Sequence, residues 1–148
     1  MIIGTAMGLT NYLVDEEVPM QLFEMTKTFI SSPIVFLLLL NVFLIVVGMM
    51  MDIFSAIFVV VPLIIPIAAA YGVDPVHLGI IFLANLEIGY LTPPVGLNLF
   101  ISSLRFDKPV FTVVRSIIPF TLILLVALAL ITYIPDLSLW LVRVLNVQ

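Results

Sequence analysis

Side chains that could do chemistry are sparse in this chain, and they gather in two short stretches. One is GMMMDIFSAIF around Asp52, and the other is NLEIGYLTPPVGLNLF, residues 85–100. The second stretch combines the carboxylate of Glu87 with asparagines, a threonine and two adjacent prolines inside an apolar run. Carboxylates and amides at such positions are expensive in hydrocarbon, and this cost indicates ion binding, proton transfer or another function.

The second stretch predicts a broken helix. Pro93 and Pro94 lack backbone N–H groups, and each disfavours helix in the residue before it. Gly96 then allows the chain to re-enter a helix at a new angle. Unwound backbone is tolerated in a membrane only where it lines a cavity, an ion or other protein. Carbonyls ending the first half-helix suit a cation such as Na⁺, and amides opening the second, VGLNLF, suit an anion. The alternative is a proline kink that serves packing alone.

Asp52 has two interpretations as well. It is either a residue of a surface loop or an ion ligand at the tip of a re-entrant hairpin. Gly48 and Ser55 provide the small size and the hydroxyl that such a tip needs, and two prolines weaken the arm that follows it. Glu87 either works directly on an ion or proton, or hydrogen-bonds to a neighbouring helix.

The composition defines the broad class. Of 148 residues 64 % are hydrophobic and 9 % are charged, which is too little polar surface for a soluble domain and indicates an integral membrane protein. No basic tract indicates a nucleic-acid partner. The absence of cysteine excludes disulfides, thiolate metal sites and thiol catalysis in this chain.

Hydrophobic runs and polar breaks divide the chain into eight segments, all expected to be helices or their connections. The expected segments are the end of a longer helix (1–14), an interfacial amphipathic helix (15–33), two short spans or one re-entrant hairpin (34–70), a polar turn (71–77), a broken transmembrane helix (78–104), a basic loop (105–115), a last span (116–135) and an amphipathic tail (136–148).

The basic loop sets the expected orientation. It carries Arg105, Lys108 and Arg115, three of the five Lys and Arg residues. The positive-inside rule places this loop in the cytoplasm, so the turn 71–77 and the tail lie outside.

Four motifs resemble one family. They are Gly48-Met49-x-Met51-Asp52, Pro62-x-x-x-Pro66, Gly72-Val73-Asp74-Pro75-Val76-His77, and Leu91-Thr92-Pro93-Pro94-Val95-Gly96-Leu97-Asn98-Leu99-Phe100. In this order and spacing they resemble the carboxyl-terminal part of the large membrane subunit, the dicarboxylate-type permease, of tripartite ATP-independent periplasmic (TRAP) transporters. The resemblance covers nearly the whole chain.

The resemblance implies an elevator-type, Na⁺-coupled secondary transporter rather than an enzyme. It makes 34–70 a re-entrant hairpin with its tip near 48–55, 78–104 its partner broken helix, 15–33 an arm and 1–14 the end of a scaffold helix. It also implies a multi-pass protein of the bacterial inner membrane and an organic acid substrate such as a C4-dicarboxylate. The implied partners are a small membrane subunit and a periplasmic substrate-binding protein, with Na⁺ as coupling ion and no other metal or cofactor.

The resulting hypothesis divides the site between the tip and the link. The expected cation ligands are Gly48, Asp52, Ser55, Thr92 and Gly96, and the expected substrate contacts are Thr92, Pro93, Pro94 and Asn98.

The chain carries only the second of the family's two inverted repeats, so we expect it to be a truncated or split-gene portion of a longer permease. One alternative function is a non-transporting accessory or remnant subunit. Another is an intramembrane aspartyl protease pairing Asp52 with Glu87, although the Gly-x-Gly-Asp context of such enzymes is missing.

Overall fold

The computed structural model describes residues 32–145, together with residues 4, 8, 11, 12, 15–18, 20, 21, 24 and 30. Ten of the fourteen residues of the expected helix end (1–14), nine of the nineteen residues of the expected interfacial helix (15–33) and the last three residues of the chain lie outside the described residues. Within 32–145 every regular element is a helix, which confirms the all-helical prediction. The helices are α3 (Pro33–Met50), α4 (Ile53–Val59), α5 (Val61–Ala70), α6 (Pro75–Tyr90), α7 (Leu97–Phe106), α8 (Val110–Tyr133) and α9 (Pro135–Val144).

Two of the described helices are long and apolar enough to cross a bilayer. α3 has 18 residues and α8 has 24, and both are strongly apolar along a stretch of spanning length. A third candidate span exists if α4 and α5 count as one element. At roughly 1.5 Å per residue α8 is about 36 Å long, which exceeds the ~30 Å hydrocarbon core. The chain is an integral membrane protein.

α4 and α5 form one bent arm that returns from the end of α3. Their axes differ by 54° across Val60. Pro62 lies in the first turn of α5, where its missing N–H costs little, and Pro66 lies inside α5. The prolines explain the bend, because a proline removes a backbone donor and clashes with the preceding turn. The re-entrant character of this hairpin stays a prediction.

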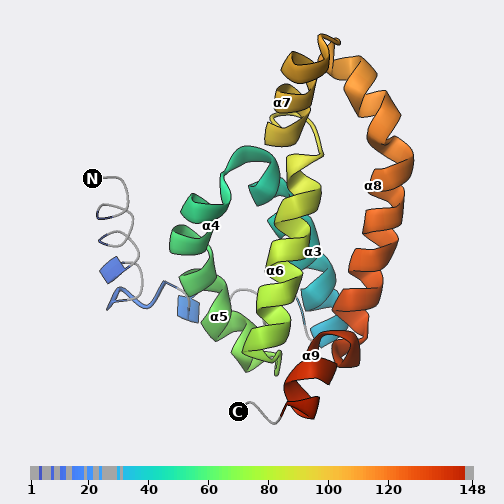
Figure 1. The fold of residues 1–148 in the computed structure, drawn as a ribbon. Helices are drawn as coiled ribbons and strands as arrows, with labels where there is room; N and C mark the ends of the chain where they lie inside the picture. Colours follow the sequence, from blue (N-terminus) through green and yellow to red (C-terminus); the bar gives the residue numbers. More distant parts are fainter. Residues whose placement is uncertain are drawn as a thin grey trace.

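α6 is the centre of the fold, with the α4–α5 arm on one side, α8 on the other and α3 behind it (Figure 1). The apolar core joins α3, the α4–α5 arm and the first three turns of α6. Its buried members include Leu44, Ala56, Ala68, Ile81 and Leu86, all at 0 % exposure. Burying these side chains fixes the arm and α3 against α6, and this packing sets where their ends lie.

Two boundaries differ from those expected. The polar turn at 71–77 is shorter, because α6 begins at Pro75, where the Asp74 carboxylate accepts hydrogen bonds from the N–H groups of Val76 and His77. The basic loop 105–115 is reduced to three residues between α7 and α8. Asp107 ends α7 in the left-handed region, at φ 50°, and Pro109 immediately precedes the first turn of α8.

Candidate functional site

The two expected chain breaks lie at the same end of one helix pair. α3 and α6 run in the same direction (Figure 1) and touch at Gly48 and Gly89, where a Cβ added to Gly89 would lie 2.6 Å from Gly48 Cα. Asp52 follows Gly48 by four residues and Thr92 follows Gly89 by three. At about 1.5 Å per residue, each break is therefore within roughly 6 Å, along its helix axis, of this closest contact.

Asp52 caps α4. Its Oδ1 accepts hydrogen bonds from the N–H groups of Phe54 and Ser55, both at 3.0 Å, and the Ser55 hydroxyl donates to Oδ2 at 2.5 Å. The side chain is exposed in the short link between α3 and α4. The Ser55 hydroxyl, with these backbone N–H groups, holds the pKa of the Asp52 carboxyl below its ordinary value. The hydrogen bonds at this link therefore favour the ionised form of the Asp52 carboxyl.

The link between α6 and α7 is unwound over residues 91–96, as the proline and glycine pattern predicts. The Thr92 hydroxyl donates to the Ile88 carbonyl at 2.7 Å, and Pro93 and Pro94 are exposed. Gly96 is buried at φ +40°, and a Cβ there would lie 2.9 Å from the Thr92 carbonyl oxygen. This position therefore requires glycine. Asn98 lies half-buried in the first turn of α7.

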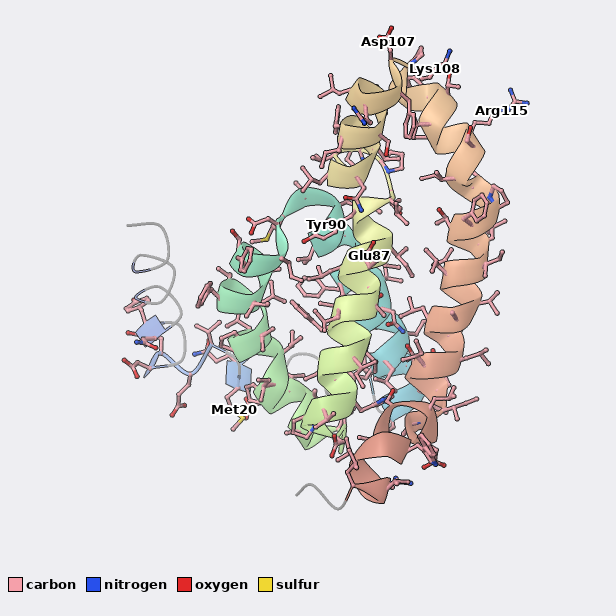
Figure 2. The ribbon with its side chains drawn as sticks, in the orientation of Figure 1. Met20, Glu87, Tyr90, Asp107, Lys108 and Arg115 are labelled. Atoms are coloured by element: carbon pink, nitrogen blue, oxygen red, sulfur yellow. The ribbon has the colours of Figure 1, made fainter. Side chains whose placement is uncertain are left out.

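Two candidates from the sequence, Gly48 and Glu87, do not have the surroundings expected of residues at a ligand-binding tip. Gly48 lies buried in the last turn of α3 against the backbone of Leu86 and Gly89, so its smallness serves helix contact. Glu87 is exposed on α6, one turn before Tyr90 near the end of that helix (Figure 2). A carboxylate on an exposed helical face suits a water-filled crevice or contact with another protein segment.

A buried polar cluster connects three helices, and sequence reasoning did not find it. Asn85 of α6 donates to Asn41 Oδ1 of α3 at 2.6 Å, and Asn41 Nδ2 donates to Thr132 Oγ1 of α8 at 3.1 Å. Asn85 and Thr132 are fully buried and Asn41 is 7 % exposed. The only sequence signal was that each of these polar residues lies within a mostly apolar run.

His77 belongs to the same junction. It was expected in the polar turn but lies buried in the first turn of α6, with Nε2 3.2 Å from the Thr132 carbonyl oxygen. Because a carbonyl only accepts, Nε2 carries the proton in this contact. Thr132 is in the last turn of α8, where carbonyls lack partners within the helix. His77 therefore caps α8.

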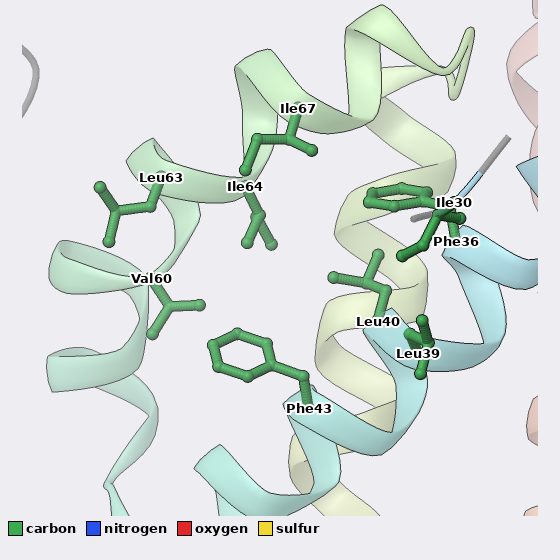
Figure 3. Close-up of a pocket in the computed structure, with 9 residues that line it drawn as sticks. All are labelled: Ile30, Phe36, Leu39, Leu40, Phe43, Val60, Leu63, Ile64 and Ile67. Atoms are coloured by element: carbon green, nitrogen blue, oxygen red, sulfur yellow. The ribbon is translucent and has the colours of Figure 1, made fainter. Parts of the chain in front are cut away.

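A cleft of about 330 Å³ lies between α3 and the bent arm (Figure 3). All of its lining residues are apolar: Ile30, Phe36, Leu39, Leu40, Phe43, Val60, Leu63, Ile64 and Ile67. Desolvating an anion against such a wall carries a large cost without a compensating partner. An organic acid has better partners at the two breaks than in this cleft.

The two breaks offer complementary charge. α3 and α6 both end there, and the carboxyl end of a helix carries partial negative charge on carbonyls without intrahelical partners. The Asp52 carboxylate adds to this at the α3 end. α7 begins at Leu97 without a side-chain cap, so its first N–H groups carry partial positive charge. A cation and an anionic group can be held side by side here.

Discontinuous helices in contact within an all-helical membrane chain are a feature of many secondary transporters. The model of the family described as tripartite ATP-independent periplasmic transporter, DctM component, matches residues 1–137, and the chain belongs to this family. The sequence-based resemblance is confirmed. Several curated relatives in the family are named as transporter permeases, which are not enzymes.

Three curated relatives illustrate the range of substrates for which similar proteins are named. The chain is 41 % identical over 138 residues to the C4-dicarboxylate TRAP transporter large permease protein DctM of Pseudomonas aeruginosa, covering 93 % of this chain and 32 % of the relative. It is 36 % identical to the isethionate TRAP transporter permease protein DctMQ of Oleidesulfovibrio alaskensis (91 % and 21 %). It is also 36 % identical to the sialic acid TRAP transporter large permease protein SiaM of Vibrio cholerae (90 % and 32 %). The chain therefore spans about a third or less of these relatives.

Proposed function

We propose that this chain forms the second half of the transport body of a Na⁺-coupled permease that takes up a small organic acid across the bacterial inner membrane. The observation that carries the proposal is the parallel contact of α3 and α6, with a chain break within four residues of Gly48 and of Gly89. Paired breaks of this kind are where secondary transporters hold ions and substrate.

Coupling follows from the order in which charge is neutralised. Na⁺ binds between the Asp52 carboxylate and carbonyls at the ends of α3 and α6, with Ser55, Thr92 and the backbone at Gly48 and Gly96 completing its shell. Once bound, the ion removes the repulsion between Asp52 and an approaching carboxylate. The substrate anion then binds across Thr92, Pro93, Pro94 and Asn98, at the amino end of α7. Neither ligand binds well alone, and this produces symport.

The substrate class is an organic anion. The three relatives above are named for a C4-dicarboxylate, isethionate and sialic acid, which share an anionic group and differ elsewhere. A C4-dicarboxylate is the leading candidate because DctM proteins named for it are similar to this chain in several organisms. A small membrane subunit and a periplasmic binding protein complete the proposed transporter, and the hairpin and broken helix move together as part of an elevator.

The test replaces Asp52 by asparagine in the complete transporter that contains this chain. Asparagine also caps helices well, so α4 is kept while the charge is lost. We expect the Na⁺ concentration for half-maximal uptake of radiolabelled succinate into proteoliposomes to rise at least tenfold.

The matched control is Asp74→Asn. Asp74 accepts hydrogen bonds from two backbone N–H groups at the start of α6, as Asp52 does at the start of α4, but it lies at the end of α6 that is away from the two breaks. We expect its Na⁺ dependence to be unchanged. If the Asp52→Asn variant and the parent protein depended equally on Na⁺, the proposal that Asp52 binds the coupling ion would be wrong. No uptake of succinate, isethionate or sialic acid by the parent would favour an accessory subunit.

A further inference from the structure

A second cleft lies beside the unwound link, on the side away from the hairpin. α8 is buried at Leu128 and Thr132, near its carboxyl end, and separates from α6 toward its amino end (Figure 1). The space left between α8 and the link is about 170 Å³. Its lining residues are Leu91, Thr92, Pro93, Val114, Ile117, Ile118, Thr121 and Leu122.

The lining of this cleft selects hydrocarbon. Its two hydroxyls are turned to their own helices, because Thr92 donates to the Ile88 carbonyl at 2.7 Å and Thr121 donates to the Ile117 carbonyl at 3.1 Å. Every other lining residue is apolar. The volume is below the roughly 300–1,000 Å³ of a small-molecule pocket. A segment of a slim alkyl chain suits both the volume and the lining.

The cleft opens on the apolar surface of a spanning helix. Ile118 and Leu122, at its edge, are 50 % and 58 % exposed. α8 is one of the two described helices that can cross a bilayer unaided. A helix of this length and composition meets lipid tails wherever no other protein segment covers it.

Basic side chains lie at the same end of α8. Arg115 precedes Ile118 by three residues and Leu122 by seven, so the three share one side of the helix. Figure 2 shows Lys108 and Arg115 close to that end, with Asp107 in the same loop. In the part of the chain that the structure describes, neither basic residue forms an ion pair. Their charge is available to an anion at the membrane surface.

We propose that this cleft binds an anionic phospholipid, with a segment of one acyl chain against Ile118 and Leu122 of α8 and the phosphate on Arg115 and Lys108. Charge complementarity selects this occupant, because a lipid without net charge brings a cation of its own beside Arg115 and Lys108 and leaves their positive charge uncompensated. The lipid fills the space between α8 and residues 91–93 and so supports the unwound link from the side of α8. Binding does not depend on transport, so it can be measured whether or not the chain couples uptake to Na⁺.

The experiment measures retained lipid by native mass spectrometry. The complete transporter is reconstituted in nanodiscs of phosphatidylcholine and phosphatidylglycerol with identical chains, then extracted in mild detergent. We expect phosphatidylglycerol to be retained at least fivefold over phosphatidylcholine. Ile118→Trp, which fills the cleft edge, and Arg115→Gln, which removes one cation near the phosphate, should each lower that retention about fivefold.

Two matched variants act as controls. Ile123→Trp makes the same change on the opposite side of α8, where the side chain is 66 % exposed, and Arg143→Gln removes a cation already paired with Asp136. Both should retain phosphatidylglycerol like the parent. Equal retention of the two lipids, or equal loss in Ile123→Trp, would overturn the proposal. So would photo-crosslinking from position 118 to another protein segment or a second copy instead of lipid.

Discussion

At the scale of single residues, two glycines allow the backbones of α3 and α6 to approach each other closely. Gly48 was predicted from the sequence as a cation ligand because it lies near Asp52. In the structure its hydrogen takes the place of a side chain against Leu86 and Gly89. Gly89 itself carried no sequence signal, since nothing in the pattern says which face of α6 meets α3. The pair brings the two breaks together without contributing a side chain to the site.

Gly89→Ala tests this contact. Its Cβ would meet Gly48 backbone atoms at 2.6 Å and the Ile45 carbonyl oxygen at 2.8 Å, and backbone cannot yield as a flexible side chain can. We expect a loss of about 1–3 kcal/mol in unfolding free energy, measured by denaturant titration of the purified protein in micelles. Gly79→Ala is the control, because it lies in the same helix with nothing within 4 Å. A similar loss in both variants would contradict the packing role.

At the scale of elements, the broken helix was predicted well and the polar cluster was not. Proline and glycine act on the backbone locally. The unwound link is therefore predictable from Thr92, Pro93, Pro94 and Gly96 without knowledge of how the helices pack. The bend between α4 and α5 likewise follows from Pro62. The hydrogen bonds of Asn41, in contrast, join it to residues 44 and 91 positions away. Such pairings depend on how helices cross, and one sequence does not reveal that.

Thr132→Val tests how α8 is attached. The substitution leaves Asn41 Nδ2 without its acceptor at a buried interface, whereas Thr121→Val removes a hydroxyl that bonds only within α8. Interhelical hydrogen bonds in membranes contribute roughly 0.6–2 kcal/mol. We expect a loss of that size for Thr132→Val and a smaller change for Thr121→Val, both in unfolding free energy. Equal effects would mean that the Asn41–Thr132 hydrogen bond does not help to hold α8 in place.

At the scale of the whole molecule, the orientation stays a prediction that cysteine labelling can settle. The chain has no cysteine, so single substitutions give unambiguous signals. With the basic loop in the cytoplasm, Lys108→Cys should react with a membrane-impermeant maleimide only after cells are permeabilised, and Val76→Cys should react in intact cells. Both side chains are exposed, so access is decided by the membrane. The opposite labelling pattern would invert the topology.

The polar cluster has a consequence for how the chain enters the membrane during synthesis. When α3 leaves the ribosome, Asn41 has neither partner, and an unpaired amide in hydrocarbon is costly. Thr132 follows 91 residues later, which at about 5–20 residues per second is roughly 5–18 seconds. During that interval α3 is favoured near water or the insertion machinery over free lipid. α8 therefore supplies the hydrogen-bond partner that Asn41 of α3 lacks, and the synthesis of α8 becomes the step that favours α3 in the bilayer.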